Sequence, residues 1–211
     1  MQLIGMLDSP YVRRVAISLL ALGLPFRHRS ISVFRGIDEF RAINPVVKAP
    51  TLVCDDGVVL MESTLILEYI EALARPRSLM PSDPAALARA LRTIGLALAA
   101  CEKSAQLVYE RALRPPEKRH GPWVQRVTGQ LRAAYAALEA QLAAEPIDLS
   151  GHAPMQDGIS AAIAWRFTQS VLADHVPCAE HPALVALSSA AEALPLFRAV
   201  PHGEAAIDGG A

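Results

Sequence analysis

Two serines stand where a helix is expected to begin, and each could bind an anion there. Ser9 precedes Pro10, a pairing typical of a helix cap followed by the first helical residue. Glu62 and Ser63 come directly before another apolar run at helical spacing. A hydroxyl and a backbone N–H at a helix start suit a carboxylate, and the neighbouring acid suits an ammonium group. Both serines could equally be ordinary helix caps.

The histidines and cysteines point to neither metal nor disulfide chemistry. The six histidines are scattered and form no pair at ligand spacing, so we expect no metal site. Cys54, Cys101 and Cys178 lie far apart, and an odd count without short spacing argues against a disulfide framework. A reducing cytoplasm is the simplest compartment for such a chain.

Composition argues against several functional classes. Among 211 residues, 20 basic and 21 acidic side chains give a net charge of −1, so no surplus charge favours nucleic acid or an anionic membrane. No apolar run of about 18 residues predicts a transmembrane helix. The N-terminus also lacks the pattern of a secretory signal. We therefore expect a cytoplasmic protein that binds neither nucleic acid nor membranes.

The elements that position the two serines follow the order β-α-β-α-β-β-α within residues 1–75. The first helix has an apolar face that leaves Arg13, Arg14 and Ser18 off it. A tight turn at Asp55-Asp56-Gly57 indicates a hairpin between the third and fourth strands. In chain order, the expected segments are 1–7, 10–22, 26–34, 36–43, 51–54, 58–61 and 63–73.

The rest of the chain is expected to be helical. Three prolines in residues 76–84 predict a linker, with Ser82 or Asp83 capping the helix that follows. The tail from His202 is rich in Gly and Ala and is expected to fray. We thus predict an N-terminal domain at 1–75 and an all-α domain at 85–211, with helices at 85–113, 124–142, 159–173 and 182–193.

Four stretches together resemble the bacterial, serine-type glutathione S-transferases. They are Ser9-Pro-Tyr-Val-Arg-Arg-Val15, Asn44-Pro-Val-Val-Lys-Ala-Pro-Thr-Leu52, Glu62-Ser63, and the apolar segment from Ile159 to Phe167. Their order and spacing span nearly the whole chain. The resemblance implies a thioredoxin-like N-terminal domain, an all-α C-terminal domain, and a cytosolic homodimer. It also implies glutathione as substrate or cofactor, without a metal.

The resemblance assigns the sulfur of glutathione to the start of the first helix. A thiol of pKa about 8.5 is only a few per cent ionised at pH 7, so the enzyme must favour the thiolate. The Ser9 hydroxyl could donate a hydrogen bond to sulfur, assisted by the helix N-terminus. Tyr11, two residues on, could take that contact instead or line the electrophile pocket. Which of the two contacts the sulfur stays open.

The resemblance also implies the remaining contacts. Ala49-Pro50 would be a cis peptide, and the Ala49 backbone would pair with the cysteinyl part of glutathione as an added strand would. Lys48 could reach the glycyl carboxylate. Glu62 and Ser63 would hold the γ-glutamyl ammonium and carboxylate. An electrophile pocket between the domains would be lined by Tyr11, Tyr109 and Trp165.

The start of the buried helix departs from the family pattern, and the function has more than one candidate. The buried helix of the family usually opens with Ser or Thr and an Asp three residues on, whereas this chain has Met155-Gln-Asp-Gly158. Either Asp157 caps from one position earlier or the helix starts less firmly, and loss of a cap costs about 1 kcal/mol. The leading function is a detoxifying transferase acting on an electrophile, although isomerisation or cleavage with glutathione would use the same groups. The alternative is a non-catalytic glutathione- or protein-binding regulator on the same fold.

Overall fold

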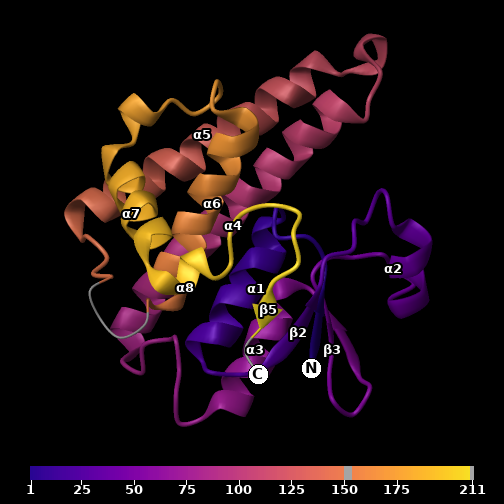
Figure 1. The fold of residues 1–211 in the computed structure, drawn as a ribbon. Helices are drawn as coiled ribbons and strands as arrows, with labels where there is room; N and C mark the ends of the chain where they lie inside the picture. The colour runs from indigo at the N-terminus through magenta and orange to yellow at the C-terminus, as the bar shows by residue number, and fades with distance from the viewer. Residues whose placement is uncertain (150–153, 210–211) are drawn as a thin grey trace. The chain divides into compact units, whose positions relative to one another are not determined.

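The computed structural model describes residues 1–149 and 154–209, apart from the side chain of Asp208. The chain forms two compact units, one made of residues 1–79 with 193–209 and the other of residues 80–192. Figure 1 shows the first unit as a sheet with helices and the second as helices alone. The predicted fold class, a thioredoxin-like domain followed by a helical domain, is confirmed.

The first unit is built on a five-stranded mixed sheet in the order β4-β3-β1-β2-β5. β1 runs parallel to β2 and antiparallel to β3, so that Leu3 pairs with both His28 and Leu52. Leu3, Ile4 and Leu52 are fully buried in the core. The elements are β1 (Gln2–Ile4), α1 (Pro10–Ala21), β2 (Phe26–Arg29), α2 (Ile37–Ile43), β3 (Thr51–Val53), β4 (Val59–Met61), α3 (Ser63–Ala74), α8 (Pro195–Arg198) and β5 (Asp208–Gly209).

Helix α1 packs against α3 and buries more of its circumference than the apolar pattern predicts. Arg13, Arg14 and Ser18 are 1%, 3% and 0% exposed, so the prediction that they lie off the buried face is wrong. Polar partners make this burial tolerable, because buried donors must be hydrogen-bonded. The Ser18 hydroxyl donates to the Arg14 carbonyl at 2.7 Å, and both arginine side chains have acceptors described below.

Residues 193–209 belong to the first unit and add a strand to it, which corrects the predicted boundaries and, as far as Gly209, the predicted frayed tail. The remainder of that prediction falls on residues 210 and 211, outside the described residues. β5 pairs antiparallel with the free edge of β2. The Ile207 N–H donates to Nδ1 of buried His28 at 3.2 Å, and His28 Nε2 donates to the Gly5 carbonyl at 2.7 Å. Arg35 and Glu204 form an ion pair at 2.6 Å. Pairing therefore covers an edge of the sheet that would otherwise be open.

The second unit contains α4 (Pro84–Ala112), η1 (Pro116–Lys118), α5 (Gly121–Ala144), α6 (Gln156–Leu172), η2 (Cys178–Glu180) and α7 (Pro182–Ala193). Buried hydroxyls join three of its helices. The Tyr135 hydroxyl donates to the Ala164 carbonyl at 2.8 Å and lies 2.6 Å from the Thr168 hydroxyl, which lies 2.7 Å from that of Ser104. Among the described residues no side chain caps α6 from Met155, but the Asp157 carboxylate accepts from the Gly158 N–H in the first turn at 2.8 Å.

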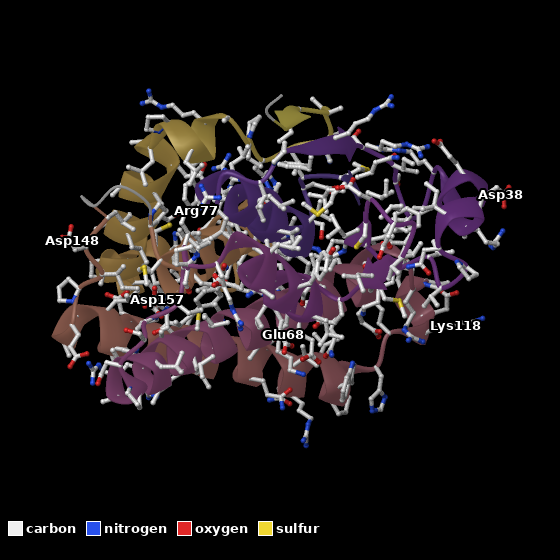
Figure 2. The ribbon with its side chains drawn as sticks, turned by 90° about the horizontal axis from the view of Figure 1, so that it is seen from below. Asp38, Glu68, Arg77, Lys118, Asp148 and Asp157 are labelled. Carbon is white, nitrogen blue, oxygen red and sulfur yellow. The ribbon has the colours of Figure 1, made fainter. Side chains whose placement is uncertain are left out.

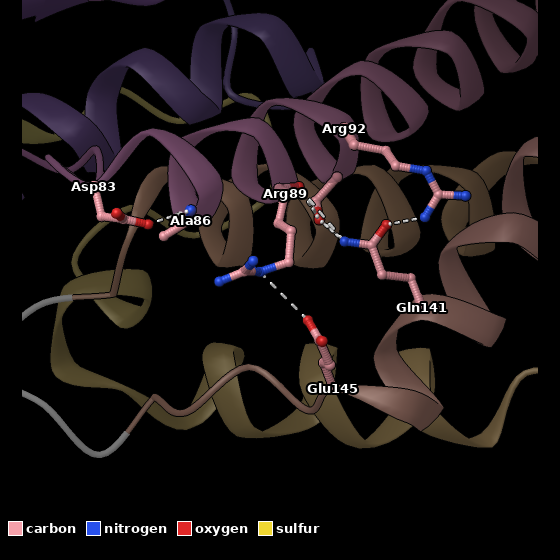
Figure 3. A network of polar contacts seen from close by, with 7 residues as sticks. Asp83, Ala86, Arg89, Arg92, Gln141 and Glu145 are labelled. Carbon is pink, nitrogen blue, oxygen red and sulfur yellow. Dashed lines mark hydrogen bonds and ion pairs between the residues drawn. The ribbon is translucent and has the colours of Figure 1, made fainter.

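Polar side chains also fasten α4 to α5 along their exposed sides. Figure 3 shows Gln141 accepting a hydrogen bond from Arg92 at 2.8 Å, and the Arg89–Glu145 ion pair at 3.6 Å. The predicted cap is confirmed, because the Asp83 carboxylate accepts from the Ala86 N–H at 2.8 Å. Charged residues elsewhere are also exposed, among them Asp38, Glu68 and Lys118, which are labelled in Figure 2.

Helix α4 is long and apolar enough to cross a membrane by length and composition alone. A core helix of a water-soluble bundle meets the same criterion, so this is weak evidence for a membrane span. In the second unit α4 packs along both α5 and α6, and about a third of its apolar window is buried there.

Candidate glutathione site

Ser9 is the N-cap of α1, and its hydroxyl accepts only a weak hydrogen bond there. The residue has extended backbone angles, φ −72° and ψ 122°, and Pro10 follows at the first helical position. The Ser9 Oγ accepts from the Val12 N–H at 3.5 Å, which is at the outer limit of a hydrogen bond. A serine hydroxyl that accepts still has its hydrogen to donate. The half-buried Ser9 can therefore offer a hydrogen bond to an anion at the positive end of α1.

Gly5 brings the loop that contains Ala49 against the start of α1. Its φ of +132° is one that side-chain-bearing residues rarely adopt. A Cβ placed there would lie 2.7 Å from Val12 Cγ2 and 3.1 Å from Ala49 Cβ. This close approach places the Ala49 backbone beside the helix that Ser9 begins. The Ala49–Pro50 peptide is cis, as the resemblance implied.

Asn44, the first residue of the second stretch that carries the resemblance, holds this loop in shape, a role that the sequence did not predict. It is 4% exposed, and its Nδ2 donates to the Thr51 hydroxyl at 2.8 Å. That hydroxyl donates in turn to the Lys48 carbonyl at 2.7 Å, and Asn44 Oδ1 accepts from the Val46 N–H at 3.0 Å. Within the described residues the Ala49 N–H and C=O have no backbone partner. They can therefore pair with an extended peptide, and the exposed Lys48 lies beside them.

Glu62 and Ser63 form the start of α3 in an unusual backbone conformation. Glu62 has φ 74° and ψ 120°, a costly combination for a residue other than glycine, and such strain is concentrated at functional sites. Its Oε2 accepts from the N–H groups of Thr64 and Leu65 at 3.1 and 3.3 Å. The carboxylate therefore caps its own helix through one oxygen. Among the described residues, Glu62 Oε1 and the Ser63 N–H make no hydrogen bond to the protein, and both are suited to a ligand.

Arg14 joins the start of α3 to α1. Its Nη1 donates to the Ser63 hydroxyl at 3.1 Å and makes a longer contact of 3.5 Å with the Thr64 hydroxyl. Through Gly5 and Arg14, three predicted site residues belong to one connected arrangement: Ser9, Ala49 and Ser63. The apolar spacing of the sequence leaves Arg14 off the apolar face of its helix, and this contact was not predicted.

Asp8 directly precedes Ser9, and its surroundings disfavour the ionised form of its carboxyl group. Burial raises the pKa of Asp8 above its ordinary value, and the Glu204 carboxylate adds to this effect. The Ser9 N–H and the Arg35 guanidinium oppose it. Glu204, in the C-terminal segment, forms an ion pair with Arg35, and both of these charges act on Asp8.

The aromatic residues predicted for the electrophile pocket have different surroundings. Tyr11 is half-buried in the first turn of α1, and Tyr109 on α4 is 48% exposed. Trp165 is 4% exposed, with its ring centroid 5.3 Å from those of both Tyr135 and His181. The structure thus gives Trp165 a packing role inside the helical unit, and a pocket role for the three aromatic residues stays a prediction.

Comparison with known proteins identifies the family. Residues 3–78 match the model of the glutathione S-transferase N-terminal domain. A glutathione transferase family member from Pseudomonas fluorescens Pf-5, solved with S-(propanoic acid)-glutathione, is 30% identical, with TM-score 0.78 over 95% of this chain and 98% of that one. A glutathione S-transferase from Methylobacterium radiotolerans, in complex with glutathione sulfonate, is 27% identical, with TM-score 0.82 over 97% and 96%. The chain belongs to the glutathione transferase family.

The similarity to one curated protein covers a shorter stretch of the chain. The uncharacterized GST-like protein YibF of Escherichia coli K12 is 33% identical over 84 residues. This match spans 40% of the present chain and 42% of that protein. The chain therefore matches less than half the length of this curated relative, and the activity of the whole protein is a matter for proposal.

Proposed function

We propose that this protein is a glutathione transferase that binds reduced glutathione and activates its thiolate for attack on an electrophilic small molecule. One observation carries the proposal: the Ser9 hydroxyl, the Ala49 backbone and the Ser63 hydroxyl belong to one arrangement, tied together by Gly5 and Arg14. Solved relatives of the same fold bind glutathione derivatives, which supports the choice of ligand.

In this proposal Ser9 is the catalytic residue. The Ser9 hydroxyl accepts a weak hydrogen bond from the Val12 N–H, so its own hydrogen can be donated to the sulfur. The N-terminus of α1 adds partial positive charge at the same place. Both effects favour the thiolate over the thiol. The sulfur then forms a C–S bond while a halide leaves, or adds to an activated double bond whose carbanion takes a proton from solvent. Tyr11 is the alternative donor to the sulfur.

The rest of the tripeptide would be held by the loop before β3 and by the start of α3. The Ala49 N–H and C=O pair with the cysteinyl backbone, while Pro50 fixes the direction of that loop. Lys48 faces the glycyl carboxylate. Ser63 binds the γ-glutamyl carboxylate through its hydroxyl and N–H, and Glu62 Oε1 accepts from the γ-glutamyl ammonium group.

The assembly, the location and the electrophile contacts of the protein are proposed from its membership of the family. We propose a cytoplasmic homodimer with a detoxifying role, in which Tyr11, Tyr109 and Trp165 are the candidates for contact with the electrophile. A dimer of two-fold symmetry would use the same surface of each copy. Neither nucleic acid nor a membrane enters the proposal.

Two measurements test the proposal. The first is calorimetric titration with reduced glutathione. The second is a turnover assay with an activated aryl halide and with an α,β-unsaturated carbonyl compound. Binding with turnover that depends on Ser9 would support it. Binding without turnover of any electrophile would favour a regulatory protein that uses the same site. No heat at millimolar ligand would remove glutathione from the account.

A further inference from the structure

Residues 201–209 lie on the first unit and are called here the C-terminal strap. The start of the strap is fixed by Arg13, whose Nε donates to the Val200 carbonyl at 2.8 Å. The strap ends as β5 on the edge of β2 (Figure 1). Between these points, the ion pair of Glu204 with Arg35 is exposed, and exposed pairs contribute little to stability. The end of the strap therefore depends mainly on β5 and on its buried neighbour in β2.

That neighbour is His28, which makes a different hydrogen bond with each of its ring nitrogens and is 5% exposed. Nε2 lies 2.7 Å from the Gly5 carbonyl oxygen, which can only accept, so Nε2 carries a proton. Nδ1 lies 3.2 Å from the Ile207 nitrogen and accepts from its N–H, so Nδ1 carries none. The two contacts together require a neutral ring with its proton on Nε2.

A second proton on His28 is incompatible with the contact to the strap. In the charged ring both nitrogens are donors, so the new Nδ1–H would point at the Ile207 N–H. The hydrogen bond to Gly5 survives this change, whereas the hydrogen bond from Ile207 becomes a repulsive contact between two donors. Burial lowers the pKa of His28, and the Gly5 hydrogen bond opposes that effect. Protonation therefore favours a state in which the end of the strap has left the ring.

We propose that His28 is a pH-sensitive latch, which holds residues 204–209 on the edge of β2 when the ring is neutral and releases them when it is protonated. In the released state water reaches the ring, which then has its ordinary pKa of about 6.5. The ratio of released to closed strap should therefore rise by up to about tenfold for each pH unit below about 6.5. Release opens the edge of β2 and takes Glu204 away from Asp8, the residue before Ser9.

Other charged groups surround the latch, and their effects can be separated from that of His28. They lie on β2, in the loop after β1 and on the strap itself: Arg27, Arg29, Asp8, His202, Glu204 and Asp208. Arg27 and Arg29 are the strand neighbours of His28, so their side chains point to the opposite face of the sheet. The charge of Glu204 helps to raise the pKa of Asp8. Protonation of Asp8 relieves this repulsion and favours the closed strap, which is the opposite sign to the effect of His28.

Hydrogen exchange of the full chain, followed by mass spectrometry between about pH 7.5 and pH 5, tests the latch. Dividing the intrinsic exchange rate at each pH by the measured rate gives the protection of the amides of residues 204–209. In wild type this protection should fall by up to about tenfold per pH unit below about 6.5. The strap should also exchange faster than α1 at each pH, because it opens while the rest of the unit stays folded.

Two substitutions at His28 test its two nitrogens separately. His28→Asn keeps an acceptor near the position of Nδ1, so the strap should stay protected down to pH 5. His28→Gln keeps a donor near the position of Nε2 but leaves the Ile207 N–H without its acceptor, so protection should be low. Neither side chain titrates in this range, and protection in both variants should be independent of pH.

Three matched variants leave His28 in place. A Cβ at Gly209 would overlap the Phe26 carbonyl, so Gly209→Ala should release the strap at every pH. His202→Gln removes the other histidine of the strap, and Asp8→Asn removes the acid before Ser9. Both should keep a loss of protection at least as large as that of wild type.

Three outcomes overturn the inference: strap protection that is constant with pH, an equal pH dependence in His28→Asn, or equal protection of the strap and α1 at every pH. If the His28 variants do not fold, nuclear magnetic resonance of wild type replaces them. The His28 ring and the Ile207 amide should then titrate with the same midpoint, and different midpoints would contradict the latch. No ligand enters these measurements, so their outcome is independent of the proposed function.

Discussion

Glu62 has two separable tasks in this account, and one pair of substitutions tests them apart. Its Oε2 caps α3 through the N–H groups of Thr64 and Leu65. Its negative charge is proposed to bind the γ-glutamyl ammonium. Glu62→Ala removes both tasks. Glu62→Gln keeps an amide oxygen that can accept the two N–H bonds but removes the charge.

The structure sets the expected magnitudes. Loss of the cap should lower the free energy of unfolding of Glu62→Ala by about 1 kcal/mol. Backbone strain adds nothing to this difference, because φ is 74° for either side chain. Glu62→Gln should lose only about 0.5 kcal/mol from the helix dipole. Losing a charge-assisted bond costs about 1.5–3 kcal/mol, so both variants should bind glutathione about 10- to 100-fold more weakly.

Calorimetric titration and urea unfolding on the three proteins provide the measurements. A deaminated analogue, with glutaryl in place of the γ-glutamyl group, is the control ligand and should bind wild type and Glu62→Gln alike. If Glu62→Gln binds glutathione as tightly as wild type, the charge of Glu62 has no part in recognition. If Glu62→Ala is as stable as wild type, the capping bonds contribute nothing measurable.

Two further predictions concern the edge of the sheet and the assembly. Burial lowers the pKa of His28 below its ordinary 6.5, so the unfolded chain binds the proton more readily and stability falls as pH drops below about 6.5. The stability advantage of wild type over His28→Gln, from urea unfolding, should therefore shrink between about pH 7.5 and 5, and a constant difference would contradict this. Sedimentation equilibrium at micromolar concentration should give about 45 kDa, twice the 22.6 kDa chain, whereas a mass near that of one chain would refute the homodimer.

Several helices and strands of the first unit could be predicted from the sequence, because each is marked by residues within a few positions of one another. Apolar periodicity, the Ser9-Pro10 start and the Asp55-Asp56-Gly57 turn correspond to α1 and to the β3–β4 hairpin. The strand expected at 26–34 is shorter, ending at Arg29, because only Phe26 to Arg29 pair with neighbouring strands.

The C-terminal strand was not accessible in this way. β5 has two residues, too few for any alternation, and its partner β2 lies about 180 positions earlier in the chain. The spacing of the apolar residues on α1 leaves Arg13 and Arg14 off the apolar face, so the pattern does not predict their burial. Their acceptors, Val200 and Ser63, are distant in sequence, and only the tertiary fold brings them together.

Part of the site followed from residue types alone, and part needed the fold. A hydroxyl before a helical run pointed to Ser9 and Ser63, and the resemblance pointed to the cis peptide at Pro50. The roles of Asn44 and Gly5 could not be predicted from the sequence. Asn44 acts through a network of side-chain hydrogen bonds, and Gly5 acts by allowing two segments to approach closely. Those are properties of packing that one sequence does not display.

The pKa of the glutathione thiol bound to wild type and to Ser9→Ala tests the central claim most directly. Ultraviolet absorbance of the thiolate near 240 nm follows the titration in both proteins. Removing the hydroxyl should raise the bound thiol pKa by about one to two units, because one unit is about 1.4 kcal/mol and a hydrogen bond to a charge is worth that much. The loss of turnover should be largest near pH 6.5 and shrink as pH rises. Coincident titration curves, with only a lower melting temperature in the variant, would show that Ser9 is a helix cap and that another group activates the sulfur.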